Sequence, residues 1–256
     1  MMRAYRESSM SYQVADGSAL PLLVVEPGDA TPPRAGIVLF HGGALREGSA
    51  DGLAPHCRAL ASRGILAASA GYRLLGRGAV SIDDCLADVR RAVEQFGRLA
   101  ASRGLDPPRL ASGGSSAGAH LAMLAAMTPS TTAAELSIAA TVALNPAGLN
   151  LGSFAPDAQR RLAQQVGIAV SRLVEYSLIE FVRPGSPPVQ IHHGIHDEVE
   201  PIGSVRQFRD AMVRAGNQCT LVEYEHAEHG FHYPGASRHF DDVIDATARF
   251  LLDRHP

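Results

Sequence analysis

The chain has 256 residues, of which 46% are hydrophobic and 19% are charged, and its net charge at pH 7 is −3. These values are typical of a folded globular protein, exclude a disordered chain, and show no basic surplus for a nucleic-acid partner. All 23 basic side chains are arginines, because the sequence contains no lysine. Chemistry that depends on lysine, such as a Schiff base or a P-loop, is therefore excluded.

Cysteines and histidines narrow the chemistry further. Cys57, Cys85 and Cys219 lie far apart and form no CxxC pair, so we expect free thiols, which suit a reducing, cytoplasmic location. Residues 1–10 contain no apolar run, and we expect neither a signal peptide nor a membrane span. The 11 histidines leave two interpretations open, a set of metal ligands or one catalytic base.

Strand-like and helix-like segments alternate along the chain, separated by turn residues. In chain order we expect strand Leu20–Glu26, strand Ala35–Phe40, helix Ala54–Arg63, strand Ile65–Ser69, helix Ser81–Leu99, strand Arg109–Gly113, a helix from Gly118 to about Thr128, strand Ile138–Leu144, strand Val189–His192, helix Val205–Ala215, strand Thr220–Tyr224 and helix Asp241–Leu252. This alternation predicts a single α/β domain over residues 1–256, with a mostly parallel sheet covered by helices on both faces.

Residues 148–185 interrupt the alternation. Helical patterns cover Pro156–Val166 and Ala169–Tyr176, between two expected strands. We interpret the stretch as a small cap insertion over the carboxyl edge of the sheet, where open α/β sheets bind ligands. Its apolar stripe fits either a lid or an ordinary packed helix pair.

The strongest motif is Gly114-Ser115-Ser116-Ala117-Gly118, a GxSxG sequence between an expected strand and an expected helix. In that context GxSxG makes a sharp turn that projects the central serine from the top of the sheet. The helix that follows directs its free N–H groups at developing negative charge. Ser116 is therefore a candidate nucleophile.

A serine hydroxyl needs a base to become a good nucleophile, and the base needs a carboxylate that holds it. Asp197 follows one late strand and His229 follows the last, so both lie at the same sheet edge as Ser116. The chain order Ser, Asp, His is that of α/β-hydrolases. We expect Asp197 to bind one ring nitrogen of His229, and the other nitrogen to take the Ser116 proton.

The segment His41-Gly42-Gly43-Ala44 directly follows the expected strand Ala35–Phe40. Glycines at this position let the backbone approach a substrate and present its N–H groups. Together with the amide of Ala117, this segment predicts an oxyanion hole.

These motifs, taken in order, resemble the serine esterases of the α/β-hydrolase superfamily, in the acetyl-esterase and carbohydrate-esterase-like branch near the hormone-sensitive-lipase group. The resemblance covers about Leu20 to Leu252 and is carried by HGG near the start, GGSSAGAHLA in the middle, and HGIHDEVEP and EHAEHGF near the end. It implies the α/β-hydrolase fold, Ser116 as nucleophile, Asp197 as acid and His229 as base. It also implies oxyanion amides at Gly43, Ala44 and Ala117, with Gly42 shaping the loop.

Two features depart from the family pattern. Many relatives have a third glycine where this chain has Ala44. The alanine still provides an N–H group for the oxyanion hole, but we expect its methyl group to narrow the acyl pocket. We expect no room for the usual N-terminal cap, because the first expected core strand begins within twenty-odd residues. Only residues 148–185 are then left to cover the site.

We therefore expect a hydrolase of short-chain, acetyl-type carboxylic esters that works through an acyl-enzyme, without a cofactor or metal. Its partner is then a small ester substrate, and a homodimer stays open. The alternatives are an amide or peptide hydrolase with the same triad, and a ligand-binding protein without activity.

Metal binding is disfavoured because His192 and His193 are adjacent, so in a strand they point to opposite faces. We expect His41 to support the oxyanion loop, His120 to be packed, and His56 to lie on the surface.

Overall fold

The computed structural model describes residues 4–28, 32–105, 110–129 and 138–253. In this part of the chain, an 8-stranded sheet has the order β1-β2-β4-β3-β7-β8-β9-β10, and β5 and β6 form a separate small pair. The strands are β1 (Tyr5–Gln13), β2 (Ala19–Pro27), β3 (Ala35–Phe40), β4 (Ile65–Ala70), β5 (Leu74–Leu75), β6 (Gly78–Ala79), β7 (Leu110–Ser115), β8 (Ala140–Leu144), β9 (Val189–Gly194) and β10 (Cys219–Tyr224).

The six strands from β4 to β10 in this order run parallel, whereas β1 and β2 are antiparallel to their neighbours. Every residue of β3, β4, β7, β8 and β9 is buried, as expected for parallel strands covered on both faces. The predicted mostly parallel α/β sheet is thus confirmed. Arg109, which we expected to open strand β7, lies outside the described residues.

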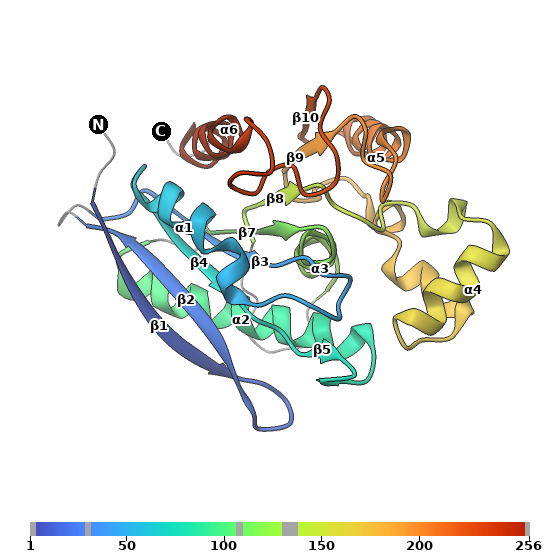
Figure 1. Cartoon of the computed structure of the whole chain (residues 1–256), viewed down its shortest axis with the longest axis horizontal. Coiled ribbons are helices and arrows are strands. Elements are labelled where there is room, and N and C mark those ends of the chain that lie inside the picture. The colour runs from blue at the N-terminus through green and yellow to red at the C-terminus, as the bar shows by residue number, and fades with distance from the viewer. Residues whose placement is uncertain (1–3, 29–31, 106–109, 130–137, 254–256) are drawn as a thin grey trace.

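Helices cover both faces of the sheet (Figure 1). Side chains of α2, α3 and α5 belong to one apolar cluster, and side chains of α1 and α6 belong to a second cluster on the opposite face. The helices, including the short 3₁₀ turns labelled η, are η1 (Ala50–Leu53), α1 (Ala54–Ala61), α2 (Ile82–Ser102), α3 (Ala117–Met127), η3 (Leu151–Ser153), α4 (Pro156–Gln165), η4 (Val170–Tyr176), η5 (Leu178–Phe181), α5 (Ile202–Arg214) and α6 (Phe240–Asp253).

A capping box starts helix α2. The Ser81 hydroxyl accepts a hydrogen bond from the Asp83 N–H, and the Asp84 carboxylate accepts one from the Ser81 N–H. The same end of α2 holds the segment between β8 and β9, since the Ile82 N–H donates to the Val166 carbonyl oxygen at 3.0 Å. Arg172 also forms two hydrogen bonds to Asp83.

Residues 148–185 extend from the end of the sheet as η3, α4, η4 and η5 (Figure 1). The expected helix over Pro156–Val166 is confirmed as α4, although it ends at Gln165. The expected helix over Ala169–Tyr176 is wrong in type, because Val170–Tyr176 forms a 3₁₀ helix. It buries only Leu173 and Tyr176, and such a narrow apolar stripe suits the 3₁₀ repeat of three residues per turn.

Strand β1 was not expected from the sequence. It forms a hairpin with β2 in register Tyr5↔Pro27 to Gln13↔Ala19, although Tyr12 is its only buried residue. The Asp16-Gly17 dipeptide, with Gly17 at φ +83°, forms the turn and is the one sequence signal for this hairpin. No helix in the described part of the chain is long and apolar enough to cross a membrane.

Candidate active site

Ser116 occupies the sharp turn between strand β7 and helix α3. Its backbone has φ 51° and ψ −119°, a strained conformation for a residue with a side chain. The two motif glycines are required by the close approach of strand β3. A Cβ atom on Gly114 or Gly118 would lie 2.3 or 2.1 Å from the carbonyl oxygen of Phe40. The GxSxG pattern is therefore a packing requirement of this turn as much as a motif.

His229 and Asp197 converge on this serine from the ends of two other strands. The Nε2 atom of His229 lies 2.9 Å from the Ser116 Oγ, and its Nδ1 atom lies 2.7 Å from the Asp197 Oδ2. Since a carboxylate only accepts hydrogen bonds, Nδ1 carries the proton and Nε2 is left to accept from the serine hydroxyl. The three predicted side chains thus form one hydrogen-bonded chain.

The Asp197 carboxylate is fixed by its own backbone turn. Its Oδ1 accepts the N–H groups of Val199 and Glu200 at 2.9 and 3.1 Å, which leaves Oδ2 for His229. Burial alone would raise the pKa of Asp197, but the hydrogen bonds from His229 and Glu200 outweigh it and lower that pKa below its usual value. The group is therefore ionised at neutral pH and can hold His229 in one tautomer.

The predicted oxyanion loop lies against the serine. A Cβ atom on Gly42 would be 3.2 Å from the Ser116 Cβ. Gly43 and Ala44 have φ values of +110° and +50°, and the Arg46 and Glu47 N–H groups both donate to the Gly43 carbonyl oxygen. Ala117 is the first residue of helix α3, where backbone N–H groups lack partners within the helix.

His41 supports this loop as expected. Its Nδ1 atom lies 2.7 Å from the Gly42 carbonyl oxygen, and its ring stacks on Tyr72 with the centroids 4.4 Å apart. The Tyr72 hydroxyl in turn donates to the His41 carbonyl oxygen at 3.0 Å. Burial lowers the pKa of His41, so the ring stays neutral and acts as a rigid spacer.

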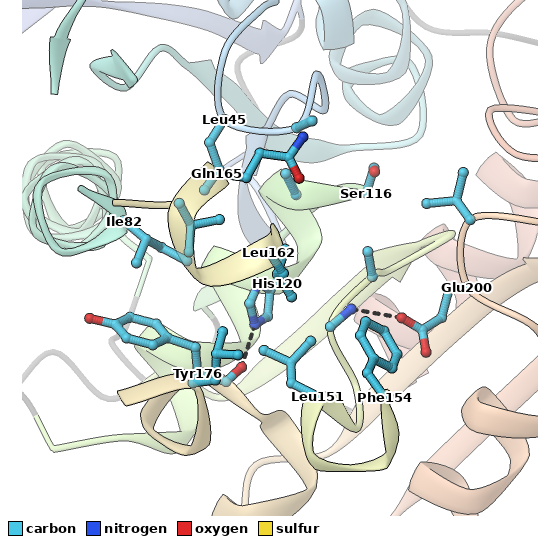
Figure 2. A pocket seen from close by; sticks show the side chains of 17 residues that line it. Leu45, Ile82, Ser116, His120, Leu151, Phe154, Leu162, Gln165, Tyr176 and Glu200 are labelled. Atoms are coloured by element: carbon cyan, nitrogen blue, oxygen red, sulfur yellow. Dashed lines mark hydrogen bonds between the residues drawn. The ribbon is translucent and has the colours of Figure 1, made fainter. Parts of the chain in front are cut away.

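A cavity of about 220 Å³ opens beside Ser116. Figure 2 shows Ser116 toward one side of it, Ile82 and Tyr176 toward the other, and His120 between them. Its lining is mostly apolar, and residues of the 148–185 segment supply nearly half of it. The lining residues are Ala44, Leu45, Ile82, Ser116, Ala117, His120, Ala147, Gly148, Leu151, Phe154, Leu162, Gln165, Val166, Leu173, Tyr176, Val199 and Glu200.

His226, His229 and His232 are spaced three residues apart, but each of them contacts different partners. His229 contacts Asp197 and Ser116, as described above, whereas the His226 ring makes an edge contact with His196. The Nε2 atom of His232 lies 2.9 Å from the Ser115 Oγ, and its Nδ1 lies 3.0 Å from the Nε2 of His56. They do not converge on one point, so their spacing does not mark a shared ligand set.

Two of the other histidine expectations have different outcomes. His120 is packed as predicted, because its Nε2–H donates to the Tyr176 carbonyl oxygen at 2.7 Å. His56 was predicted to lie on the surface, which is wrong: it is 1% exposed. Its contact with His232 and with the rings of Tyr233 and Phe240 explains why helix α1 buries a polar residue.

Solved structures of an esterase from the planctomycete Thermogutta terrifontis resemble this chain over nearly its whole length. The propionate-bound structure is 32% identical in sequence, has a TM-score of 0.85, and matches 97% of this chain and 94% of that chain. The same protein phosphonylated by sarin has a TM-score of 0.86 at 32% identity, with 97% and 95% covered. The chain belongs to the α/β-hydrolase serine esterases.

Two further matches agree with membership of the serine esterases. The profile of the BD-FAE family matches residues 23–147. The probable carboxylic ester hydrolase LipM of Mycobacterium tuberculosis is 27% identical over 241 residues, which is 84% of this chain and 54% of that protein. The chain thus spans about half the length of this curated relative.

Sequence reasoning missed two buried residues at the site of this serine-esterase chain. Asn145, at φ 38° after strand β8, places its Nδ2 atom 3.4 Å from the His229 Nε2 and accepts the Gly230 N–H. Glu200 lines the cavity and is 1% exposed. The signal for Asn145 was its place directly after a buried strand at the carboxyl edge, before Pro146. For Glu200 it was a carboxylate three residues after Asp197.

Proposed function

We propose that this protein hydrolyses carboxylic esters with short acyl groups, with Ser116 as nucleophile, His229 as base and Asp197 as the acid that orients it. The observation that carries the proposal is the pair of contacts on the His229 ring, 2.9 Å to the Ser116 Oγ and 2.7 Å to the Asp197 Oδ2. Nucleophile and base within hydrogen-bond reach, with the base held by a third group, is the arrangement that activates a serine.

The first half of the reaction forms an acyl-enzyme. The Ser116 Oγ attacks the ester carbonyl carbon while Nε2 of His229 takes the hydroxyl proton. The negative charge on the carbonyl oxygen is received by the N–H groups of Gly43, Ala44 and Ala117, while Gly42 keeps the loop close to the serine. Loss of one such donor raises the barrier by about 3–4 kcal/mol. When the tetrahedral intermediate collapses, Nε2–H protonates the departing alcohol.

The second half releases the acid. A water molecule gives a proton to Nε2 of His229 and its oxygen attacks the acyl carbonyl carbon, which forms a second tetrahedral intermediate at the same N–H groups. Its collapse breaks the bond to the Ser116 Oγ, which recovers its proton from Nε2. Proton transfer by one imidazole suffices for both halves, so the reaction as written uses no cofactor or metal.

Short acyl groups are favoured by the cavity beside Ser116. Its volume of about 220 Å³ and its apolar lining suit a small hydrocarbon chain rather than a long lipid chain. The related Thermogutta terrifontis esterase has been solved with propionate and with butyrate bound, which supports the same substrate class here.

We further propose that residues 148–185 serve as the cap of a single catalytic domain. The proposal rests on their contribution to the cavity lining and on their contacts with the rest of the chain. Arg46, next to the oxyanion loop, donates to the Gln165 carbonyl oxygen at 2.6 Å, and the Ile82 N–H donates to Val166. The free thiols of Cys57, Cys85 and Cys219 support a reducing compartment such as the cytoplasm.

The test is a rate profile on p-nitrophenyl esters from acetate to dodecanoate, with matched p-nitroanilides beside them. The proposal predicts the highest kcat/KM between acetate and hexanoate, little rate on dodecanoate, and esters far ahead of anilides. Faster hydrolysis of the anilides would favour the amide-hydrolase alternative. The absence of turnover on every compound would favour a ligand-binding protein.

A further inference from the structure

Residues 178–179 of the segment 148–185 return to its start and cross it there. The carbonyl oxygen of Gly148 accepts the Leu178 N–H at 3.4 Å, and that of Leu149 accepts the Ile179 N–H at 2.9 Å. Gly148 has φ +74°, and a Cβ atom there would lie 3.0 Å from the His120 ring. The start of the segment therefore packs against His120 on helix α3, about one helical turn after Ser116.

A buried carboxylate holds the opposite side of this crossing. The Glu200 Oε2 accepts the Gly148 N–H at 2.7 Å, and the Leu149 N–H also binds the carboxylate. Its Oε1 accepts the hydroxyl of Ser204. Figure 2 shows Glu200 at the edge of the cavity, with its contact to the backbone of Gly148 drawn as a dashed line. At this crossing, the carbonyl oxygens of Gly148 and Leu149 thus bind residues 178–179, while the N–H groups of the same two residues bind the Glu200 carboxylate.

The same residue is part of the turn that carries Asp197. The Glu200 N–H donates to the Asp197 Oδ1 at 3.1 Å, and its carbonyl oxygen accepts the His193 Nε2–H at 2.8 Å. The backbone of Glu200 therefore belongs to the turn over residues 197–200, which we call the acid turn. Its side chain is bound to the start of the segment 148–185. Burial raises the pKa of Glu200, against the lowering effect of its hydrogen bonds to Ser204, Gly148 and Leu149.

We propose that Glu200 is a positioning residue that anchors the start of residues 148–185 to the acid turn and thereby sets the selectivity of the cavity for acyl length. The role rests on the proposed ester hydrolysis. Leu151 and Phe154, which follow Gly148 closely, line the cavity. An acetyl methyl group stays near Ser116, whereas a longer chain reaches these residues. A shift of the segment therefore weakens binding of longer acyl groups more than that of acetyl.

The experiment compares the wild-type protein with Glu200→Val, Glu200→Gln and the control Glu180→Val. Glu180 is exposed on η5 of the same segment, so the control makes the same chemical change away from the crossing. The first readout is the ratio of kcat/KM for p-nitrophenyl butyrate to that for the acetate. The second is hydrogen exchange of the Gly148 and Leu149 amides.

We expect Glu200→Val to lower the butyrate-to-acetate ratio about tenfold, which corresponds to about 1.4 kcal/mol, and to accelerate exchange of both amides. Glu200→Gln keeps an acceptor for the Gly148 N–H and an NH₂ donor for the Ser204 oxygen. We therefore expect its butyrate-to-acetate ratio to stay within about twofold of the wild-type ratio, and the same for Glu180→Val. If Glu200→Val does not fold, Glu200→Asp replaces it, since the shorter side chain withdraws from Gly148.

An unchanged ratio in folded Glu200→Val or Glu200→Asp would overturn the proposal, and so would a Glu200→Gln variant as impaired as Glu200→Val. The exchange measurement separates this inference from the proposed function. If the wild-type protein hydrolyses no ester, the proposed function fails, while faster exchange at Gly148 and Leu149 in Glu200→Val still supports the anchor.

Discussion

The Nε2 atom of His229 lies 2.9 Å from the Oγ of Ser116, although the two residues are 113 positions apart in the chain. Parallel topology produces this contact, because Ser116, Asp197 and His229 follow strands β7, β9 and β10, whose carboxyl ends share one edge of the sheet. The turn at Ser116 then raises its hydroxyl above that edge.

Replacing Asp197 by asparagine tests the proposed role of the acid. The amide keeps the size of the side chain and an oxygen for the Val199 and Glu200 N–H groups, but it can present a donor to Nδ1 of His229. The tautomer that leaves Nε2 free is then disfavoured, and we expect kcat to fall by about 10⁴-fold. Steady-state kinetics on p-nitrophenyl acetate measure the loss. Asp210→Asn, at an exposed position on α5, is the control and retains full activity; a loss below tenfold in Asp197→Asn would contradict the assigned role.

Gly43→Ala tests the oxyanion loop. A Cβ atom there would lie 2.2 Å from the Glu47 carbonyl oxygen, at a backbone φ of +110°, so the loop must shift and its N–H groups move from the developing charge. We expect kcat to fall by about 10²–10³-fold, the effect of one lost oxyanion donor.

The matched control for this glycine is Gly203→Ala. Gly203 lies in helix α5 with open space around its Cβ position, so we expect unchanged kinetics and a gain of about 0.5–1 kcal/mol in the free energy of unfolding. If Gly43→Ala kept wild-type kcat, this loop would not supply the oxyanion donors.

Buried histidines predict a loss of stability in mild acid. Burial lowers the pKa of His56 and His120 to about 4 and that of His192 to about 3, from 6.5. Between these values the unfolded chain binds more protons than the folded one, so the stability is fully present above pH 6.5 and falls as the pH drops toward 4. Urea unfolding at pH 7.5, 6.5, 5.5 and 5 measures the free energy in a range where most carboxyl groups stay ionised.

His120→Gln isolates one of these contributions. The amide can donate to the Tyr176 carbonyl oxygen as the ring does, but it does not titrate. We expect the free energy of unfolding to fall less steeply between pH 6.5 and 5 than in the wild-type protein. Equal slopes for the two proteins, or a wild-type stability that rises toward pH 5, would show that these rings do not produce the acid sensitivity.

Leu162→Trp tests whether the cavity takes the acyl chain. Leu162, on α4, lines the cavity, and a larger ring there fills space that a butyrate chain would use. We expect kcat/KM for p-nitrophenyl butyrate to fall at least about tenfold more than that for the acetate, since a lost site for two methylenes costs about 1.6 kcal/mol. A parallel fall for both esters would place the acyl chain elsewhere.

The buried strands and most helices could be predicted from the sequence because their apolar patterns are bounded by turn residues. Strand β1 could not, since its residues are exposed except for Tyr12 and show no apolar alternation. It exists through its pairing with β2, which is a tertiary contact. The 3₁₀ geometry of Val170–Tyr176 was also missed, because apolar spacing of three and four residues does not distinguish it from an α-helix.

The residues of the site also differ in whether the sequence indicates them. Ser116, Asp197 and His229 each follow a recognisable strand, so their meeting at one sheet edge could be predicted. Asn145 and Glu200 bind backbone N–H groups that lie 85 and 52 residues away. Every residue type except proline offers such an N–H group, and therefore no side-chain pattern in the sequence indicates these two contacts.

Labelling with a fluorophosphonate tests the central claim most directly. The reagent reacts with a serine only when a base activates its hydroxyl, and peptide mass spectrometry locates the adduct. We predict one adduct on Ser116, with loss of p-nitrophenyl acetate hydrolysis in proportion to labelling, and neither labelling nor hydrolysis in a folded Ser116→Ala variant. An adduct on another residue, or hydrolysis that persists in Ser116→Ala, would contradict the account.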